Sequence, residues 1–479
     1  MNALFKPKAS PAIMARPLAG ASPASPARPA RPARPARRAL ALVATLIGSA
    51  LYSPAWSLDL SQAYEAALAQ DASIRTTMAA TAARHERLPQ ARAQLLPNLS
   101  LSASRNRNAL ESTTPSFFGT PVTAYRHYTS SSEALTLRQP LFRPYQMADY
   151  RQAQAQVDDA DAILERELQN VGVRVSGAYF EALLTADQLA LVLAQKSTYT
   201  SQLDAAKKRF AAGAGTRTDI DEAQAALDLN VAQELEARQN VDFTRRQLQT
   251  LINQPIDRLA ALDPAKMALT PPSPERLEDW TERAETSSPE IRSLKAQVET
   301  ARHEVTKAQA GHYPTLDAVA QWSRSDSDTV TSVNSRYTDK SLGLQLTVPI
   351  FSGGYVNASV RQALADQERA EQALEALRRD LGVRVHREFR GVTEGVLKVK
   401  ALEQAVRSTG LVALSNQRSY EAGSRTLIDT LNAEQQKVSA QRDLAQARFI
   451  YLISRVRLQA LTGGEKAGVI TQINGWLTP

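Results

Sequence analysis

The side chains that most often perform catalytic or metal chemistry are sparse in this sequence, and their spacing does not suit such chemistry. The chain has five histidines and no cysteine, so thiolate chemistry and a disulfide framework are excluded. His303-Glu304 and His312 lack the spacing of a helical zinc motif, and no phosphate-binding glycine loop is present. Asp158-Asp159 falls on a charge-rich helical pattern, which is typical of a solvated face. The sequence predicts no enzyme, no metal site and no cofactor.

A different set of polar residues is regularly spaced, because it occurs twice. Thr216 and Asp219 stand three residues apart in front of an apolar pattern, as do Thr426 and Asp429. This spacing is typical of a capping box, which starts a helix. A glycine lies three residues before each threonine, and an aromatic residue lies three before the glycine. The two motifs are therefore Phe210-x-x-Gly213-x-x-Thr216-x-x-Asp219 and Tyr420-x-x-Gly423-x-x-Thr426-x-x-Asp429, 210 residues apart.

Long helices must position these two turns. Between Gln146 and Phe210 there is no proline, and apolar or small residues recur every three or four positions, the period of one helix face. A helix of this length would span about 100 Å, whereas an ordinary globular helix has about 11–12 residues. A return helix is expected over about 216–253. The first long helix is therefore predicted to be a rod.

Extended segments precede each long helix. A helical pattern over about 58–96 ends at Leu96-Pro97, where proline disfavours further helix, and Tyr313-Pro314 repeats this signal 217 residues later. Apolar residues then alternate with polar ones, at Leu99, Leu101 and Ala103 in the first copy and at Leu316, Ala318, Ala320, Trp322, Leu342, Leu344, Leu346 and Val348 in the second. Each copy is predicted to contain a helix, a β-hairpin with strands of roughly ten residues, a very long helix, a glycine turn and a return helix.

These signals divide the chain into five segments. A basic stretch, the apolar run 39–51 and the small residues of Ala55-Trp56-Ser57 indicate a signal peptide over 1–57, with either Met1 or Met14 as the start. The alternative is a disordered basic tail before a short anchor helix. The first repeat is expected at 58–255, a proline-rich linker at 256–277, the second repeat at 278–464 and a C-terminal tail at 465–479.

The charge distribution argues against a nucleic-acid partner. The chain has 57 basic and 49 acidic residues. Eight of the basic residues lie before residue 58, where there is no acidic residue, so the remainder is neutral. A phosphate-binding protein would concentrate positive charge on its folded surface.

The alternating strands suit a transmembrane β-barrel, with a half-buried soluble hairpin as the alternative. Four strands cannot close a barrel around a usable interior, and lipid does not tolerate an open sheet edge. Two chains would supply eight strands and three would supply twelve. Because side chains fill an eight-stranded barrel, a channel requires at least three chains.

The repeated order of elements, the flanks Gln139-Pro140-Leu141-Phe142 and Val348-Pro349-Ile350-Phe351 and the two turns resemble the TolC family of outer-membrane efflux and secretion channels over about 58–464. The resemblance implies a mainly α fold with a small β part. Duplicated long helical hairpins would form a trimeric α-barrel, and four strands per chain would contribute to a 12-stranded transmembrane β-barrel. The expected homotrimer spans outer-membrane lipid and has a large periplasmic extension.

The resemblance also implies a gate at the periplasmic end. Tyr420 and Arg425 would meet Thr218 and Asp219, within or between chains, and Asp429 would face the axis as a ring of three carboxylates. Relatives often carry a second acid at the position of Asn432, which Glu434 could replace if it turns inward. Gly213 and Gly423 would form the hairpin turns.

Two functions remain open at this stage. The first is the exit duct of a type I protein-secretion system, docked through a periplasmic adaptor (membrane fusion) protein to an inner-membrane ABC transporter, with an exported protein such as a large toxin as cargo. The second is the outer-membrane channel of a multidrug or metal efflux pump. The absence of a lipidation cysteine favours secretion. A periplasmic coiled-coil adaptor, as a third class, would have one hairpin and no amphipathic strands.

Overall fold

The computed structural model describes residues 57–326, 335–464 and 466–478. The predicted signal peptide therefore lies outside the described residues, except for Ser57. The helices are α1 (Leu60–Gln70), α2 (Ala72–His85), α3 (Arg87–Ala93), α4 (Pro144–Ala211), α5 (Arg217–Ile252), α6 (Leu277–Ser287), α7 (Pro289–Gln309), α8 (Tyr355–Glu421), α9 (Leu427–Leu461) and α10 (Lys466–Asn474), with a 3-10 turn at Ala310–His312. The strands are β1 (Asn98–Pro115), β2 (Pro121–Phe142), β3 (Ala261–Leu262), β4 (Thr315–Asp326), β5 (Arg336–Thr347) and β6 (Leu477–Thr478).

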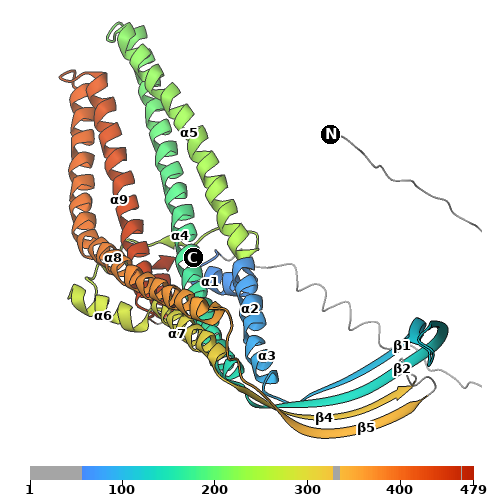
Figure 1. The fold of residues 1–479 in the computed structure, drawn as a ribbon. Coiled ribbons are helices and arrows are strands. Elements are labelled where there is room, and N and C mark those ends of the chain that lie inside the picture. Colours follow the sequence, from blue (N-terminus) through green and yellow to red (C-terminus); the bar gives the residue numbers. More distant parts are fainter. Residues whose placement is uncertain (1–56, 327–334, 465, 479) are drawn as a thin grey trace, which may run out of the picture. The chain divides into compact units, whose positions relative to one another are not determined.

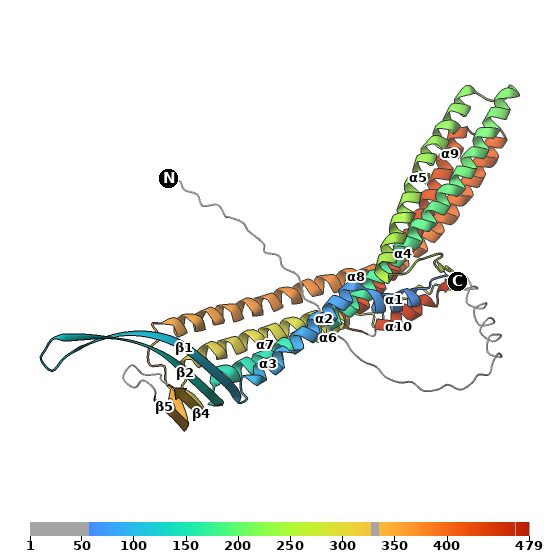
Figure 2. The same cartoon turned by 90° about the vertical axis from the view of Figure 1, so that its right-hand side faces the viewer.

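The two long helices dominate the fold, as the apolar periodicity predicts. Helix α4 has 68 residues and α8 has 67. Pro144 occupies the start of α4, where its missing N–H has no helical acceptor to lose. Each long helix turns back into a return helix, α5 or α9, and the two hairpin turns lie at one end of the long helices while β1, β2, β4 and β5 lie at the other (Figures 1 and 2).

The expected single helix over 58–96 is wrong in detail, because it is broken into α1, α2 and α3. Asp71 leaves the helical region with ψ of 123°, and its carboxylate accepts a hydrogen bond from the Ser73 N–H at 2.6 Å, which caps α2. Pro89 has no N–H to donate to the preceding turn, so the helix is interrupted again before α3. The second copy breaks in the same way at Ser288, between α6 and α7.

Helices of the two copies pack across one another. Helix α7 lies against both α4 of the first copy and α8 of its own, and α9 also contacts α4. The main core contains the fully buried Tyr179 and Tyr451. The Tyr179 hydroxyl lies 2.9 Å from the carbonyl oxygens of both Leu58 and Ala260, so one side chain of α4 holds two distant segments of chain.

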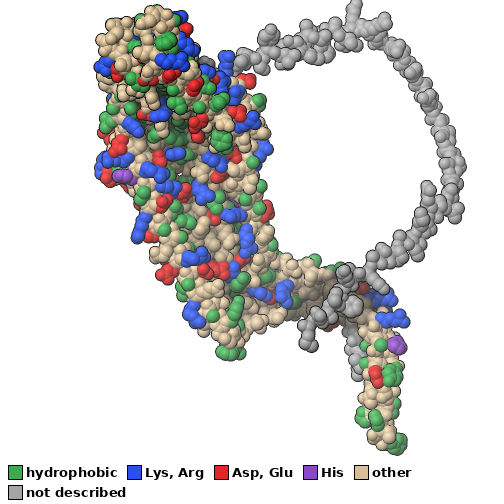
Figure 3. All heavy atoms as spheres, turned by 90° about the horizontal axis from the view of Figure 1, so that it is seen from above, with side chains coloured by type: hydrophobic (Ala, Val, Ile, Leu, Met, Phe, Trp, Pro, Cys, Tyr) green, Lys and Arg blue, Asp and Glu red, His purple; other side chains and the backbone are tan. Residues whose placement is uncertain are grey.

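Helix α4 is long and apolar enough by length and composition to cross a membrane, with a third of its most apolar window buried inside the chain. Core helices of soluble proteins meet the same criterion, so this property alone does not indicate a span. On the face drawn in Figure 3, basic and acidic side chains are intermixed over the helices.

The four long strands form one antiparallel sheet in the order β1-β2-β4-β5. The two hairpins are therefore joined through β2 and β4. Strands β4 and β5 have 12 residues each, but β1 has 18 and β2 has 22, so the expected length of roughly ten is wrong for the first hairpin. Its outer part is polar, and cross-strand side-chain bonds such as Thr113 to Thr123 at 2.9 Å continue the pairing there.

A buried carboxylate joins the sheet to the long helix. Asp317 of β4 is 4% exposed. Arg143, immediately before α4, donates from Nε to Asp317 Oδ1 at 2.9 Å and from a second guanidinium nitrogen to Oδ2. Two parallel bonds of this kind fix orientation as well as distance. This contact connects the first copy of the duplicated unit to the second.

Candidate functional site: the hairpin tips and the strand faces

Both glycine turns close in the same way. Gly213 and Gly423 have φ of +71° and +79°, a region that glycine adopts readily. A Cβ at either position would meet nothing within 4 Å, so the need for glycine is conformational and does not come from crowding. In each turn, a backbone N–H after the glycine bonds back to a carbonyl of the long helix, Ala214 to Arg209 and Ser424 to Ser419, both at 2.9 Å.

The capping boxes predicted at the start of the return helices are confirmed. The Asp219 N–H donates to Thr216 Oγ1 at 3.1 Å, and the Thr216 N–H donates to Asp219 Oδ2 at 3.0 Å. In the second turn, the Thr426 N–H and hydroxyl both donate to Asp429 Oδ2, at 3.1 and 2.7 Å. Each carboxylate is thus already bonded within its own turn.

Arg425 lies beside Asp429 of its own turn, with 3.9 Å between Nη1 and Oδ1. Among the described residues, no hydrogen bond or ion pair joins Arg425 to Asp219 of the same chain. The Thr426 hydroxyl, then the Thr426 N–H and then the Arg425 guanidinium lower the pKa of Asp429 below its usual value. A contact of Arg425 with Thr218 or Asp219 of another chain stays a prediction.

Tyr420 connects the two hairpins through a residue that the sequence analysis missed. The guanidinium carbon of Arg209, at the end of α4, lies 4.2 Å from the centroid of the Tyr420 ring. Arg209 Nη1 also donates to the Tyr420 carbonyl oxygen at 3.5 Å. A cation over a tyrosine ring contributes about 0.5–1 kcal/mol at an exposed site. The equivalent residue of the second copy is Ser419. This difference between an arginine and a serine at the same position of the two turns is the sequence feature that could have indicated a role for Arg209.

An apolar cluster lies beneath this cation–π contact. Its members come from α4, α5, α8 and α9, and they are Tyr199, Leu203, Ala206, Ala223, Tyr420, Leu427 and Leu431. Fully burying a leucine contributes about 1.5–3 kcal/mol, more than one cation–π contact. Within a single chain, apolar packing is therefore the main contact between the hairpins near their tips.

The remaining predicted gate residues lie on exposed or partly exposed surfaces. Thr218 is exposed in the first turn, and Asn432 is exposed on α9. Asn432 lines a groove of about 700 Å³ between the α4–α5 hairpin and α9. Glu434 is paired with Lys437 of its own helix at 3.0 Å, so a neighbouring positive charge offsets its carboxylate.

In its part near the helices, the sheet has one apolar and one polar face, and the cross-strand register shows this directly. Residues opposite one another point to the same face. One row across all four strands is Leu99, Leu137, Ala320 and Leu342, and the adjacent row on the other face is Ser100, Thr136, Gln321 and Ser341. Leu342 is 84% exposed. An exposed apolar face on a single-layer sheet needs a cover of lipid or protein.

Asp159, a carboxylate of the kind that could bind metal or catalyse a reaction, has a structural role. The described residues contain no group of three or more His, Cys, Asp or Glu side chains that could hold a metal ion. The interpretation of Asp158-Asp159 as a solvated pair is wrong for Asp159, which accepts hydrogen bonds from Ser293 Oγ at 2.5 Å and Gln297 Nε2 at 3.1 Å. These bonds connect α4 to α7, because α7 crosses over the first copy.

Comparison with known proteins agrees with this architecture. The chain matches the family described as "Outer membrane efflux protein" over residues 63–254 and 280–464. It is 34% identical to the alkaline protease secretion protein AprF of Pseudomonas aeruginosa over 86% of each chain. It is 29% identical to the proteases secretion protein PrtF of Dickeya chrysanthemi, covering 92% of this chain and 95% of that one.

A solved structure has the same fold. The outer membrane protein VceC of Vibrio cholerae has a TM-score of 0.72 at 19% identity, over 85% of this chain and 96% of that one. Duplicated helical hairpins on an amphipathic sheet thus define an outer-membrane channel protein, which is not an enzyme. The chain belongs to the outer membrane efflux protein family, the TolC family that its repeated motifs resemble.

Proposed function

We propose that three copies of this chain form one continuous channel. Their twelve strands would close a barrel in the outer membrane, and their twelve hairpin helices, α4, α5, α8 and α9 from each chain, would continue it as a periplasmic tunnel. The observation that carries this proposal is the sheet itself. Its outer strands, β1 and β5, have no further strand beside them among the described residues, and one of its faces is apolar in the part near the helices.

The physical reason is that a lipid-exposed sheet edge leaves backbone donors and acceptors unpaired. Eight strands would close into a barrel filled by side chains, whereas twelve leave a lumen. The edge strands of neighbouring chains would pair with one another, and the apolar row through Leu342 would face lipid.

We further propose that the channel is the exit duct of a type I protein-secretion system. It would dock through a periplasmic adaptor to an inner-membrane ABC transporter and release a protein from the cell in one step. Support comes from AprF and PrtF, whose names describe protease secretion and which match most of this chain. A secreted protease therefore joins a toxin as a candidate cargo. The second candidate function is multidrug or metal efflux.

The gate at the hairpin turns would control this duct. Arg425 and Tyr420 would hold the second hairpin against Thr218 and Asp219 of the first, across chains, in addition to the contact with Arg209 within the chain. Asp429 would line the axis, and the turns at Gly213 and Gly423 would move outward when the channel opens.

Two measurements test the assembly and the cargo separately. Light scattering in mild detergent should give the mass of three chains, and a monodisperse monomer with its β signal intact would overturn the trimer. Deletion of the gene in its host should remove one or more proteins from the culture medium while leaving susceptibility to drugs and metals unchanged. The reverse result would favour the efflux function.

A further inference from the structure

The chain just after α9 lies against the junction between α6 and α7. A cavity adjoins this contact and is also lined by the long helices α4 and α8. Gly463, just after α9, has φ of +67°, and a Cβ there would lie 2.5 Å from the Ser287 carbonyl oxygen, so the two segments touch through their backbones. The adjoining cavity has a volume of about 180 Å³. Four arginines line it, two of which, Arg384 and Arg387, come from α8.

Two of the four arginines are paired with carboxylates, of which Glu290 and Glu388 also line the cavity. Arg384 binds Glu290, and its Nε lies 2.8 Å from Asp380 Oδ2. Arg387 Nε donates to Glu388 Oε1 at 3.2 Å. The other two arginines, Arg166 of α4 and Arg457 of α9, have no hydrogen bond or ion pair with any residue that the structure describes. Arg166 and Arg457 are therefore the two arginines of the cavity wall that have no paired carboxylate among the described residues.

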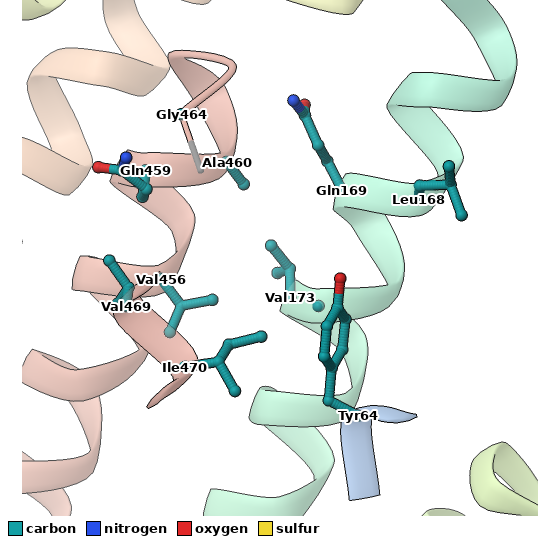
Figure 4. Close-up of a pocket in the computed structure, with 11 residues that line it drawn as sticks. Tyr64, Leu168, Gln169, Val173, Val456, Gln459, Ala460, Gly464, Val469 and Ile470 are labelled. Carbon is teal, nitrogen blue, oxygen red and sulfur yellow. The ribbon is translucent and has the colours of Figure 1, made fainter. Parts of the chain in front are cut away.

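Buried donors without acceptors point into the same region. Gln169 of α4 is 7% exposed, and its Nε2 has no hydrogen-bond acceptor among the described residues. The Nε of Arg166 is likewise buried without an acceptor. Figure 4 draws the neighbouring pocket, which Gln169 also lines, and shows Gln169 extending from α4 with its amide toward the space between α4 and α9. A buried donor without a partner is destabilising, so an acceptor at this place would be stabilising.

The N-terminus of α7 adds to the positive potential. Helix α7 has 21 residues, and the side chain of its N-cap residue, Ser288, makes no capping bond. The first helical residue is Pro289, which has no N–H, so the backbone donors at this terminus are those of Glu290 and Ile291. Ser288 and Glu290 both line the cavity. Unsatisfied N–H groups and the helix dipole at such a terminus favour an anion.

We propose that this cavity binds a small tetrahedral oxyanion of the phosphate or sulfate class. Arg166 and Arg457 would supply the charge, Gln169 would supply an amide donor and the start of α7 would supply backbone donors. The planar fork of arginine suits the oxygens of such an ion. A metal cation is disfavoured, because the two charged groups without a paired carboxylate are guanidinium groups, which can only donate. A bound oxyanion would bridge α4, α7 and α9 where the short helices meet.

Titration with inorganic phosphate at constant ionic strength tests the site. The full chain, assembled and purified in detergent in chloride buffer, should bind phosphate saturably by calorimetry and melt at a higher temperature when phosphate is present. Arg166→Gln should weaken binding by about tenfold or more. Arg151→Gln is the matched control, since Arg151 is an exposed arginine of the same helix and lies outside the cavity.

Further variants keep the result interpretable. If Arg166→Gln does not assemble, the exposed Arg457→Gln and the uncharged Gln169→Leu replace it, and both should weaken phosphate binding. Crystals soaked in selenate should show an anomalous peak within hydrogen-bond distance of Arg166. The proposal is overturned if the wild type does not bind, if the control loses as much affinity as the site variants, or if a neighbouring chain's carboxylate fills the cavity.

Discussion

Arg174 and Arg384 occupy equivalent positions of the two long helices, 210 residues apart, and each binds the start of a short helix after a break in the chain. Arg174 Nη2 lies 2.9 Å from Asp71 Oδ2, and Arg384 Nη1 lies 3.4 Å from Glu290 Oε1. Asp71 and Ser288 break the two copies with nearly the same backbone angles, φ and ψ of −61° and 123° against −62° and 128°. At the break, the second copy has Ser288 where the first copy has Asp71. The carboxylate that binds the arginine belongs to Glu290, two residues later, so the contact is retained.

Removal of Arg174 should destabilise the protein more than removal of an exposed arginine. Asp71 is buried, so Arg174→Ala would leave its carboxylate without its counter-ion. Arg174 itself is partly exposed, and solvent screens the pair, so a loss of about 1–3 kcal/mol is expected. Arg379→Ala is the control, because Arg379 forms an exposed i,i+4 pair with Glu375 that contributes about 0.3–0.5 kcal/mol. Equal melting temperatures for the two variants would contradict this assignment.

A charge on the apolar face of β5 should block membrane assembly, while the same charge one residue earlier should not. Leu342 belongs to the apolar row and Ser341 to the polar row. Leu342→Arg would place a charge in lipid at a cost of about 2–4 kcal/mol near the bilayer midplane, whereas Ser341→Arg would face water. The measurement is the amount of assembled protein in outer-membrane fractions. If both variants assemble equally well, β5 is not a membrane strand.

The structure adds Arg209 to the residues predicted to hold the gate at the hairpin turns closed. Arg209→Gln removes the cation over Tyr420, and Arg425→Ser removes the predicted contact between chains. Each change alone should be worth about 0–1 kcal/mol, but three symmetric copies add, so the double variant should raise single-channel conductance in planar bilayers. Arg217→Gln is a control, since Arg217 lies in the same turn region and its ion pair within the described part of the chain is with Asp221 of its own helix. If the double variant conducts like the wild type, the residues of these turns act only as helix caps and do not hold the channel closed.

Asp429 and Asp219 allow a matched test of the proposed carboxylate ring, because each aspartate forms a capping box of the same type at the start of its own return helix. Asp429→Asn and Asp219→Asn should cost similar amounts of helix stability, but only Asp429→Asn should reduce cation selectivity and block by multivalent cations. The bonds from Thr426 and the nearby Arg425 lower the pKa of Asp429. The stabilisation from that ionised carboxylate is therefore fully present above the ordinary pKa of about 3.9 and lost as pH falls through the lowered value. Cation block should persist at pH 5 and weaken only in stronger acid.

Much of the fold could be predicted because its signals are local and occur twice. The long helices, both glycine turns and both capping boxes follow from apolar period and from residues three apart in sequence. The breaks at Asp71 and Glu86 were missed, because a cap or a proline within a helical pattern changes only one or two residues. The length of β1 and β2 was missed because their outer parts are polar and keep pairing through backbone and side-chain bonds.

The contacts of the candidate site were harder to predict. Arg209 and Tyr420 are 211 residues apart, and nothing in either local pattern pairs them. Asp159 was interpreted as solvated because its partners, Ser293 and Gln297, belong to the other copy. The packing of α7 against α4 is a tertiary contact that no local sequence pattern indicates. The predicted contacts of Arg425 involve more than one chain, so no property of a single chain determines them.

The outer edges of β1 and β5, which have no further strand beside them in the described structure, also constrain the order of events in biogenesis. Helices satisfy their own backbone bonds, so the hairpins of a newly exported chain can form in water. In the proposed trimer, the sheet would reach its final state only when neighbouring chains pair with it, since a lone chain would expose the outer edges of β1 and β5 and the apolar row through Leu342. In a three-chain barrel, closure of the last seam and entry into lipid would be coupled. The rate of trimer assembly should therefore rise steeply with the concentration of unassembled chains. Chains that remain unassembled would become substrates for proteases.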